Sequence, residues 1–371
     1  MSSVRQIAKR MRLSVATVSR ALNNHPEISP ETRDRVLKAA NEIGYVGAIG
    51  KRVTTNIGLV FTSDAPFTEF DGLLLAGMTR GVAEQRFDIT IVNLERDKDS
   101  GETYTQFFMR KGIRGAVLRT FTHSRRTCEA IAEEGFPSIV VAERFDNPRV
   151  NFIYSDSGPD SRRAVEHLIH LGHRRIAFVM NHLRDRDHTD RHDAYRATLE
   201  SAGIQYDPEL VISVPADLAG GKAALNRLMT RPVPPTAIYY ADPLACVGAI
   251  TRAHEIGLLI PDELSIVGFD DADIRFRVWP VLTAVCQNAT QLGFEAALWL
   301  TRRLTGREEH GLQKQAATFF EVHGTTGLPP KRPVRILPDG SRIAVNASES
   351  TAAGSNNGSD AGSGGNGKHK H

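Results

Sequence analysis

Short apolar runs alternate with amphipathic helical segments along most of this 371-residue chain. The apolar runs have the length of strands and cover residues 57–61, 89–92, 115–118, 138–141, 176–180, 237–240 and 265–268. Segments with helical spacing lie between them, at residues 73–85, 161–171, 194–202 and 244–256. This order predicts parallel sheets that are covered by helices on both faces. Because about ten strands are too many for one small sheet, we expect two similar lobes, with ligands bound beyond the carboxyl ends of the strands.

The first fifty residues have a different pattern, which predicts three short helices. Residues 7–23 predict two helices separated by a tight turn. Ser3, followed three residues later by a glutamine, has the spacing of a capping box for the first helix, and Ser14 can cap the second. A third helix is expected to begin after Ser29, with Pro30 in its first turn. Three such helices can close a small core, so this segment is predicted to be an all-α helix-turn-helix headpiece.

Side chains that point outward from the second of these helices suit contacts with DNA. Thr17 and Ser19 can bond base edges or phosphates, and Arg20 can pair with guanine or a phosphate. Val15 and Ala16 can contact thymine methyl groups. All residues that we predict to contact DNA are Ser3, Ser14, Val15, Ala16, Thr17, Ser19, Arg20, Asn23, Ser29, Tyr45, Lys51, Arg52 and Val53.

The charge of the chain agrees with this prediction. Residues 1–52 hold ten Lys and Arg against four Asp and Glu, a net charge of +6, whereas the whole chain carries only +3. Such an asymmetry favours a nucleic-acid-binding module joined to a domain with another task. The alternative, a solvated helical bundle that binds nothing, does not account for the agreement between charge, caps and outward side chains.

Composition indicates a cytoplasmic protein. No apolar run follows Met1 and no apolar stretch is long enough to span a bilayer, so we expect neither a secretory signal nor a membrane anchor. The three cysteines, Cys128, Cys246 and Cys286, are odd in number and widely spaced. That arrangement is typical of buried free thiols in a reducing compartment.

The sequence lacks the motifs of common enzyme classes. It has no Gly-x-Ser-x-Gly elbow, no Walker loop and no Gly-x-Gly-x-x-Gly after a strand, so we expect neither catalysis nor a cofactor. A dense His and Asp tract covers residues 182–193, and His188 and His192 are four residues apart, which would suit a metal pair on a helix. Because no His-Glu-x-x-His motif accompanies them, we favour a solvated loop that binds hydroxyl groups, and no metal.

Three short motifs in the first 45 residues carry a family resemblance. They are Leu-Ser-Val-Ala-Thr-Val-Ser-Arg-Ala-Leu-Asn at residues 13–23, Ile-Ser-Pro-Glu-Thr-Arg at residues 28–33 and Ile-Gly-Tyr at residues 43–45. This segment closely resembles the headpiece of the lac repressor/galactose repressor family of bacterial transcription regulators, and the similarity extends over about residues 3–328. The resemblance implies a homodimeric repressor whose affinity for operator DNA is controlled by a small molecule, usually a sugar. It also implies an α/β two-lobed periplasmic-binding-protein-like domain with Rossmann-like lobes.

Pattern and resemblance together divide the chain into four segments. We expect the headpiece at residues 1–46, a hinge at 47–56, an effector-binding and dimerisation domain at 57–328, and a tail at 329–371. Lobe 1 is expected at about residues 57–156 and 288–328, and lobe 2 at about 157–287. The tail is rich in Pro, Ser, Gly and Asn, and we expect it to be disordered.

The segment around the hinge departs from the pattern of the family. Gly47 replaces the usual proline, and two glycines with a β-branched run disfavour a helix by a few tenths to about 1 kcal/mol each. We expect a weak hinge helix that forms only on DNA, where Lys51 and Arg52 hold phosphates and Val53 is the apolar wedge. Arg12 stands where the family commonly has glycine, which predicts local strain if the backbone there is left-handed.

The resemblance also assigns candidate effector contacts, most of them directly after a strand. Asp270, in Val-Gly-Phe-Asp-Asp at residues 267–271, matches an acid that holds ligand hydroxyls, although a turn-capping role is the alternative. Arg191, in Arg-His-Asp-Ala-Tyr, matches an arginine that reaches the ligand. Asp242 occupies the position of a ligand-binding Asn, which suits an effector with more hydroxyl groups or some positive charge.

Three weaker candidates complete the predicted effector site. Phe67 or Phe70 can stack on the apolar face of a sugar, and a core position is the alternative for either. Asp156 lies at a strand-to-helix junction, where it lines the cleft or caps the helix. Gln287 matches a polar residue on a strand that crosses between the lobes, with a structural role first and ligand contact second.

We therefore predict a DNA-binding transcription regulator, a repressor of a carbohydrate-utilisation operon controlled by a sugar bound between two lobes. The homodimer would read a near-palindromic operator, one half-site for each headpiece. Two alternatives remain open from the sequence. One is a regulator of the same family that responds to a purine or another metabolite, and the other is a sugar-binding protein without a role on DNA.

Overall fold

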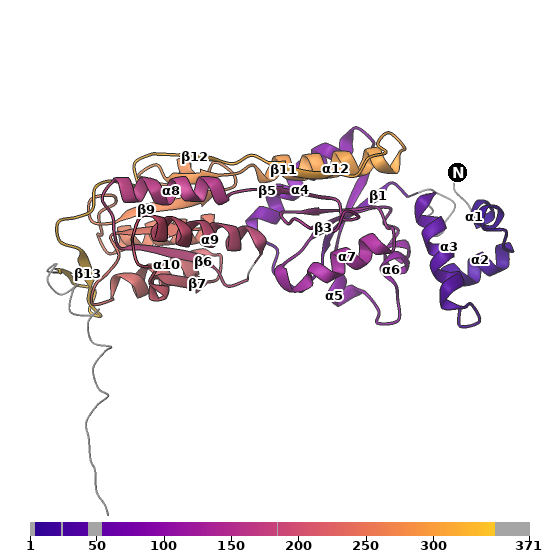
Figure 1. Cartoon of the computed structure of the whole chain (residues 1–371), viewed down its shortest axis with the longest axis horizontal. Helices are drawn as coiled ribbons and strands as arrows, with labels where there is room; N and C mark the ends of the chain where they lie inside the picture. Colours follow the sequence, from indigo (N-terminus) through magenta and orange to yellow (C-terminus); the bar gives the residue numbers. More distant parts are fainter. Residues whose placement is uncertain (1–3, 24, 44–53, 184, 346–371) are drawn as a thin grey trace, which may run out of the picture.

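The computed structural model describes residues 4–23, 25–43, 54–183 and 185–345. Figure 1 shows a small helical unit at the N-terminal end, followed by two α/β lobes that lie side by side along the long axis. Each lobe contains a six-stranded sheet, and a two-stranded sheet lies near the C-terminal end of the described residues. The predicted fold class, a helical headpiece joined to a two-lobed domain with parallel sheets, is confirmed.

Three helices form the N-terminal unit: α1 (Val4–Met11), α2 (Val15–Leu22) and α3 (Pro30–Glu42). They enclose a core in which Ile7, Val18 and Val36 are fully buried. The Oγ atom of Ser14 accepts a hydrogen bond from the backbone N–H of Thr17 at 2.9 Å, so Ser14 caps α2 as predicted. The predicted cap Ser3 and the predicted C-terminal end of the third helix lie outside the described residues.

The first lobe contains an all-parallel sheet. Its strands, in spatial order, are β11 (Gln313–Ala316), β5 (Phe152–Ser155), β4 (Ser138–Val141), β3 (Ala116–Arg119), β1 (Asn56–Phe61) and β2 (Asp88–Asn93). Its helices are α4 (Glu69–Ala83), α5 (Leu94–Asp97), α6 (Tyr104–Arg110), α7 (Arg125–Glu133) and α12 (Ala289–Leu304). Apolar clusters pack on each face of this sheet, as expected for strands that are buried on both sides.

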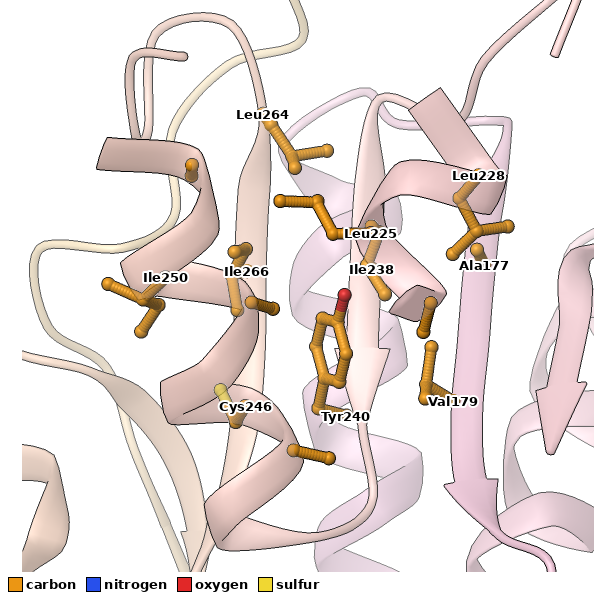
Figure 2. Packing of buried hydrophobic residues seen from close by; sticks show 14 of the residues in the cluster. Ala177, Val179, Leu225, Leu228, Ile238, Tyr240, Cys246, Ile250, Leu264 and Ile266 are labelled. Carbon is orange, nitrogen blue, oxygen red and sulfur yellow. The ribbon is translucent and has the colours of Figure 1, made fainter. Parts of the chain in front are cut away.

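The second lobe repeats this arrangement with one antiparallel edge strand. Its strands, in spatial order, are β12 (Phe319–Glu321), β10 (Thr283–Cys286), β9 (Ser265–Asp270), β8 (Ala237–Tyr240), β6 (Ile176–Asn181) and β7 (Val211–Val214). Only β12 runs antiparallel to its neighbour. Its helices are α8 (Gly158–His170), α9 (Arg186–Ser201), α10 (Leu218–Met229) and α11 (Pro243–Glu255). Figure 2 shows Tyr240 and Ile266 of the strands packed against Leu225 of α10 and Ile250 of α11.

Glycines bring one helix pair in each lobe into very close contact. A Cβ atom added at Gly77 of α4 would lie 1.9 Å from the carbonyl oxygen of Thr290 in α12. In the second lobe, a Cβ atom added at Gly221 of α10 would lie 1.9 Å from the carbonyl oxygen of Ala245 in α11. Neither backbone can accept a larger side chain without moving the helices apart.

We expect Gly77→Ala to lower the free energy of unfolding by about 2–3 kcal/mol, because overpacking forces the α4 and α12 backbones apart. Gly72→Ala is the matched control in the same helix, since its added Cβ would meet only the Phe67 ring, at 3.8 Å. The control should be neutral or stabilising by up to about 1 kcal/mol, because Ala favours a helix over Gly. Urea unfolding of both variants measures the two free energies of unfolding. Equal stabilities would show that the α4–α12 contact tolerates a methyl group.

Residues 319–345 correct two predictions. We expected residues 288–328 in lobe 1, but β12 pairs with β10 in the sheet of the second lobe. We expected a disordered tail from residue 329, but β13 (Val334–Ile336) and β14 (Arg342–Ala344) form an antiparallel hairpin. The hairpin buries Ile336 in the core of the second lobe, and Arg342 donates to Glu263 at 2.8 Å. The short apolar segment around Ile336 is thus sufficient to hold this otherwise polar part of the chain against the second lobe. Residues 346–371 lie outside the described residues.

Two predictions from composition can be compared with the structure. Cys128, Cys246 and Cys286 are free and buried, as expected. Among the helices of the described residues, none has both the length and the apolar character that crossing a membrane requires.

Candidate functional site

Five of the thirteen side chains that were predicted to contact DNA lie on α2, and three of them are exposed. Val15 is 48% exposed, although it is a large apolar residue on the surface of a small domain. Ala16 and Arg20 are also exposed, whereas Thr17 and Ser19 are half-buried. The inward face of the helix supplies Val18 and Ala21 to the core instead. Val15, Ala16 and Arg20 therefore point outward as expected, whereas Thr17 and Ser19 do so only in part.

Hydrogen bonds within the N-terminal unit already use several of the predicted contact residues. The Oγ atoms of Ser14 and Thr17 are 2.8 Å apart, and Asn23 donates its side-chain amide to the carbonyl oxygen of Ser19. Ser29 caps α3 by accepting from the backbone N–H of Thr32 at 3.2 Å. These residues hold the helices in place.

The side chain of Arg20 is exposed and forms one ion pair. Its Nη1 atom lies 3.2 Å from Oε2 of Glu27, and both side chains are more than half exposed. Such a pair contributes little to stability, so Arg20 can exchange this partner for another anion. The other predicted DNA contacts, Ser3, Tyr45, Lys51, Arg52 and Val53, lie outside the described residues, as does most of the predicted hinge.

Arg12, in the turn between α1 and α2, has a left-handed backbone with φ of +55°. This position was predicted to be strained if left-handed, because a side chain costs energy there that glycine avoids. We expect Arg12→Gly to raise the free energy of unfolding of the N-terminal unit by about 0.5–1 kcal/mol, after the greater chain entropy of glycine is subtracted. Thermal unfolding of the two proteins measures this difference. A lower melting temperature in Arg12→Gly would show that the arginine makes contacts that outweigh the strain.

A cleft of about 330 Å³ lies between the two lobes, at the carboxyl ends of strands from both sheets. The first lobe contributes residues 66–70, together with Arg119, Phe121 and Ala142 after β3 and β4. The second lobe contributes the segments that follow β6, β7 and β8, and residues at the ends of β9 and β10. This volume is in the range of small-molecule sites, and the position agrees with the rule for ligands of open α/β sheets.

Five of the seven candidate effector residues line this cleft: Phe67, Phe70, Arg191, Asp242 and Gln287. Phe67 is 51% exposed, although its ring lies 5.8 Å from that of the buried Phe61. Asp242 caps α11 by accepting from the backbone N–H of Ala245 at 3.2 Å.

Asp270 does not line the cleft, which corrects the prediction that it contacts the effector. Its carboxylate is fully buried and accepts hydrogen bonds from the backbone N–H groups of Ala272 and Ile274, each at 3.0 Å. It also accepts from the guanidinium of Arg275 at 2.7 Å. The alternative role, a cap for the turn after β9, is therefore the observed one. Its neighbour Asp271 lines the cleft instead.

Asp156 also lies outside the cleft. Its Oδ1 atom accepts from the backbone N–H of Gly158 at 3.3 Å, and its Oδ2 atom accepts from the side chain of Gln315 at 3.2 Å. It borders a separate surface depression at the junction of the lobes, which also includes Arg144 and Asp190. Arg144 follows β4 in the first lobe and donates to both carboxylate oxygens of Asp190 in α9, at 2.7 and 3.1 Å, so this ion pair joins the two lobes.

The His and Asp tract is helical from Arg186 onward and contributes to the cleft, so the prediction of a solvated loop was wrong for that part. Asp185 caps α9 by accepting from the backbone N–H of His188 at 2.9 Å and from its Nδ1 atom at 2.7 Å. Asp187 and His188 are buried and line the cleft. The capping spacing was a signal for this helix, because Asp185 stands three residues before His188. Among the described residues, no cluster of three or more His, Cys, Asp or Glu side chains is arranged to hold a metal ion.

The two arginines of the cleft have buried partners. Arg119 donates to Asp71 at 3.0 Å. Arg191 donates to the hydroxyl of Ser157 at 3.0 Å and to the carbonyl oxygen of Ala241 at 2.8 Å, and its guanidinium lies 3.5 Å from the centre of the Phe269 ring. These contacts fix both guanidinium groups.

Burial changes the titration of the acids in the cleft. It raises the pKa of Asp187 to about 7, although Arg191 opposes this shift, and raises the pKa of Asp271 to about 6, against the opposing hydrogen bond from Gln287. Burial also raises the pKa of Asp242. Burial acts on Asp185 in the same sense, but His188 and Arg119 outweigh it and hold the pKa of Asp185 well below its usual range. The cleft therefore contains acids that ionise at very different pH values.

Within the described part of the chain, three buried polar atoms of residues that line the cleft have no hydrogen-bond partner. They are Oδ1 of Asp187, Nε2 of His188 and Oε1 of Gln287. Each of these side chains is at most 7% exposed. Since buried polar atoms are rarely left without partners, these three indicate a site built for a polar ligand.

Comparisons with known proteins agree with the two parts of this architecture. Residues 3–47 match the family described as bacterial regulatory proteins, lacI family, and residues 165–318 match a periplasmic binding protein-like domain. The chain is 28% identical over 343 residues to the HTH-type transcriptional regulator DegA of Bacillus subtilis (strain 168), covering 90% of this chain and 97% of DegA. It is 29% identical over 337 residues to the HTH-type transcriptional repressor CytR of Escherichia coli (strain K12), covering 89% of this chain and 97% of CytR.

A solved structure shows the same fold. The LacI family transcriptional regulator from Enterococcus faecium with bound ribose is similar with a TM-score of 0.64 and 23% identity, covering 74% of this chain and 100% of that one.

Proposed function

Since this chain belongs to the lacI family of bacterial regulatory proteins, we propose that it represses a carbohydrate-utilisation operon and releases the operator when a sugar binds in its interlobe cleft. DNA binding and transcriptional regulation are the properties of the family. The sugar, the operon and the individual contact residues are our proposal for this chain.

The observation that carries the proposal is the exposed face of α2. Val15, Ala16 and Arg20 stand on the surface of a unit whose core is already complete without them. An exposed Val serves no folding purpose there, but together with Arg20 on the same helix it suits the major groove, where apolar groups meet thymine methyls and Arg reads guanine. The net charge of +6 on residues 1–52 would add affinity for the phosphate backbone.

The cleft supports a sugar as the effector. Carboxylates of Asp242 and Asp271 can accept hydrogen bonds from neighbouring hydroxyl groups, and the exposed Phe67 ring offers an apolar surface to the face of a sugar. The structural neighbour from Enterococcus faecium contains ribose, which fits this chemistry. Because both lobes line the cleft, a ligand there would change the balance between open and closed lobes.

An exposed apolar patch on the second lobe supports a homodimer. Phe276 is 56% exposed and Phe319 is 45% exposed, and both rings lie against the guanidinium of Arg275. Trp279, in the same loop as Phe276, is 76% exposed. Large exposed apolar groups that gather in one place mark a protein contact. We propose that this patch pairs with itself across a two-fold axis, which would set the spacing of the two headpieces.

Selection of duplex DNA from a random library by the purified full chain tests this function. We expect enrichment of a near-palindromic sequence, and a fluorescence-anisotropy titration at fixed ionic strength should show weaker binding to it when the right sugar is added. A thermal-shift screen of sugars, sugar phosphates and purines identifies that effector, because a ligand of the native state raises its apparent stability. Failure to enrich any duplex, with or without metabolites, would leave only a sugar-binding protein. Turnover of a glycoside would point to an enzyme.

A further inference from the structure

We propose that the cleft recognises a polyhydroxylated ligand that carries a protonated amine, an amino sugar rather than a neutral sugar or a sugar phosphate. This inference rests on the proposed function, because it names the chemical class of the effector. It follows from the charge of the cleft, from the way its arginines are used and from the hydrogen-bonding character of its unpartnered atoms.

Acidic side chains outnumber basic ones in the cleft. Among the described residues that line it, six are carboxylic acids, two are arginines and two are histidines. The acids are Glu69, Asp185, Asp187, Asp217, Asp242 and Asp271. Five of these acids, all except Glu69, belong to the second lobe, so an anionic ligand would meet a field of the wrong sign there, whereas a cation would be attracted.

The arginines offset only part of this charge. Arg119 already pairs with Asp71, an acid that lies outside the cleft lining. Arg191 donates to the neutral oxygens of Ser157 and Ala241, and it forms an ion pair without a hydrogen bond with Asp187, at 3.7 Å. The described residues of the cleft thus keep an excess of acidic side chains.

The unpartnered buried atoms can accept hydrogen bonds. Oδ1 of Asp187 and Oε1 of Gln287 are carboxylate and amide oxygens. Nδ1 of His188 lies 2.7 Å from the carboxylate of Asp185, so the third unpartnered atom, Nε2 of the same ring, points away from that pair. A ligand that satisfies the two oxygens must offer donors, and an ammonium group offers three with no acceptor of its own.

The burial of Asp187 lets this acceptor distinguish a positively charged donor from a neutral one. The side chain is 5% exposed, so a ligand that reaches it must leave water behind. Arg191 lies 3.7 Å from Oδ2 and donates elsewhere, so Oδ1 still lacks a donor. A hydroxyl group can supply that donor, whereas an ammonium group supplies the donor together with a positive charge that stabilises the ionised carboxylate. Asp187, at the start of α9, is therefore the residue that distinguishes an amine from a hydroxyl group.

Matched pairs of sugars that differ only at one carbon test the inference with the full chain. The pairs are D-glucosamine with D-glucose, D-galactosamine with D-galactose and D-mannosamine with D-mannose, each titrated by calorimetry at pH 7.0. We expect at least one amine to bind about tenfold or more tightly than its neutral partner, as a charge-assisted hydrogen bond would provide. Glucose 6-phosphate should not bind.

Variants test whether the preference for the amine over the neutral sugar arises in the cleft. Asp187→Asn should bring the affinities for amine and neutral sugar within about threefold of each other, and Asp271→Asn should reduce the preference in part. Asp193→Asn is the matched control, because Asp193 lies in the same helix α9 with a side chain that is 69% exposed, outside the cleft lining. It should keep the full preference for the amine.

The proposal is overturned if no amine binds more tightly than its neutral partner in any of the three pairs, whether or not the neutral sugars bind. It is also overturned if the preference for an amine survives in Asp187→Asn. Selection of operator DNA needs no effector, so a protein that selects an operator but fails this test remains a repressor with a neutral effector. A protein that selects no operator would contradict the proposed function itself.

Discussion

Arg20→Ala should weaken binding to the selected operator by roughly 5- to 150-fold at fixed ionic strength, the equivalent of about 1–3 kcal/mol for the loss of one bidentate base contact. The side chain is exposed on α2 and has Glu27 as its ion-pair partner, so its removal leaves the core of Ile7, Val18 and Val36 intact. Binding to unrelated duplexes should fall much less. Anisotropy titrations with the operator and with a scrambled duplex measure both effects.

Glu27→Ala removes the other partner of the same ion pair and should change the operator affinity in the opposite direction. It removes an acid from the DNA-facing side and frees Arg20 from its partner at 3.2 Å, so operator affinity should rise by a few-fold. Melting temperatures of both variants should stay close to that of the parent, because exposed ion pairs contribute little. If Arg20→Ala binds the operator as tightly as the parent chain does, α2 is not the recognition helix.

Asp187→Asn should stabilise the free protein at pH 8 but not at pH 4. Burial raises the pKa of Asp187 to about 7, whereas the same group in the unfolded chain titrates near its ordinary value of 3.8. The native state therefore holds a proton that the unfolded state has lost, and the parent chain loses stability as pH rises from about 4 to 7. The amide of the variant does not titrate, so its relative gain should grow across that window to the order of 1–3 kcal/mol.

Urea unfolding of parent and variant at pH 4, 6 and 8 measures this gain. The groups that face Asp187 are Arg191 and His188 on α9, Asp185 at its start and Arg119 from β3, and all of them are retained in the variant. Asp193→Asn, with an exposed side chain, should show no such pH dependence. A constant difference between parent and Asp187→Asn at all three pH values would show that the native carboxyl titrates normally. The gain in stability should be accompanied by a loss of effector response, as is common when a binding group is replaced.

The sequence located some of the candidate effector residues in the cleft and placed one of them a single position away from it. Phe67, Phe70, Arg191 and Asp242, which were predicted to contact an effector, line the cleft. Asp270 does not, although it is adjacent in sequence to Asp271, which does. Successive side chains leave a strand on opposite sides, so a motif that ends a strand locates the site to within one residue but not to a face.

The sequence alone determined the local features of the structure. Caps such as Ser14, the apolar spacing of α2 and the alternation of strands with helices depend on contacts within a few residues, so the order of the amino acids is sufficient to predict them. Only the tertiary structure decided which acids share one cleft, that Asp187 is buried there without a partner for Oδ1, and that residues 333–345 fold onto the second lobe. Burial and charge in the cleft arise where the ends of β3, β6, β8, β9 and β10 meet, and the position of those ends depends on packing between residues far apart in the chain.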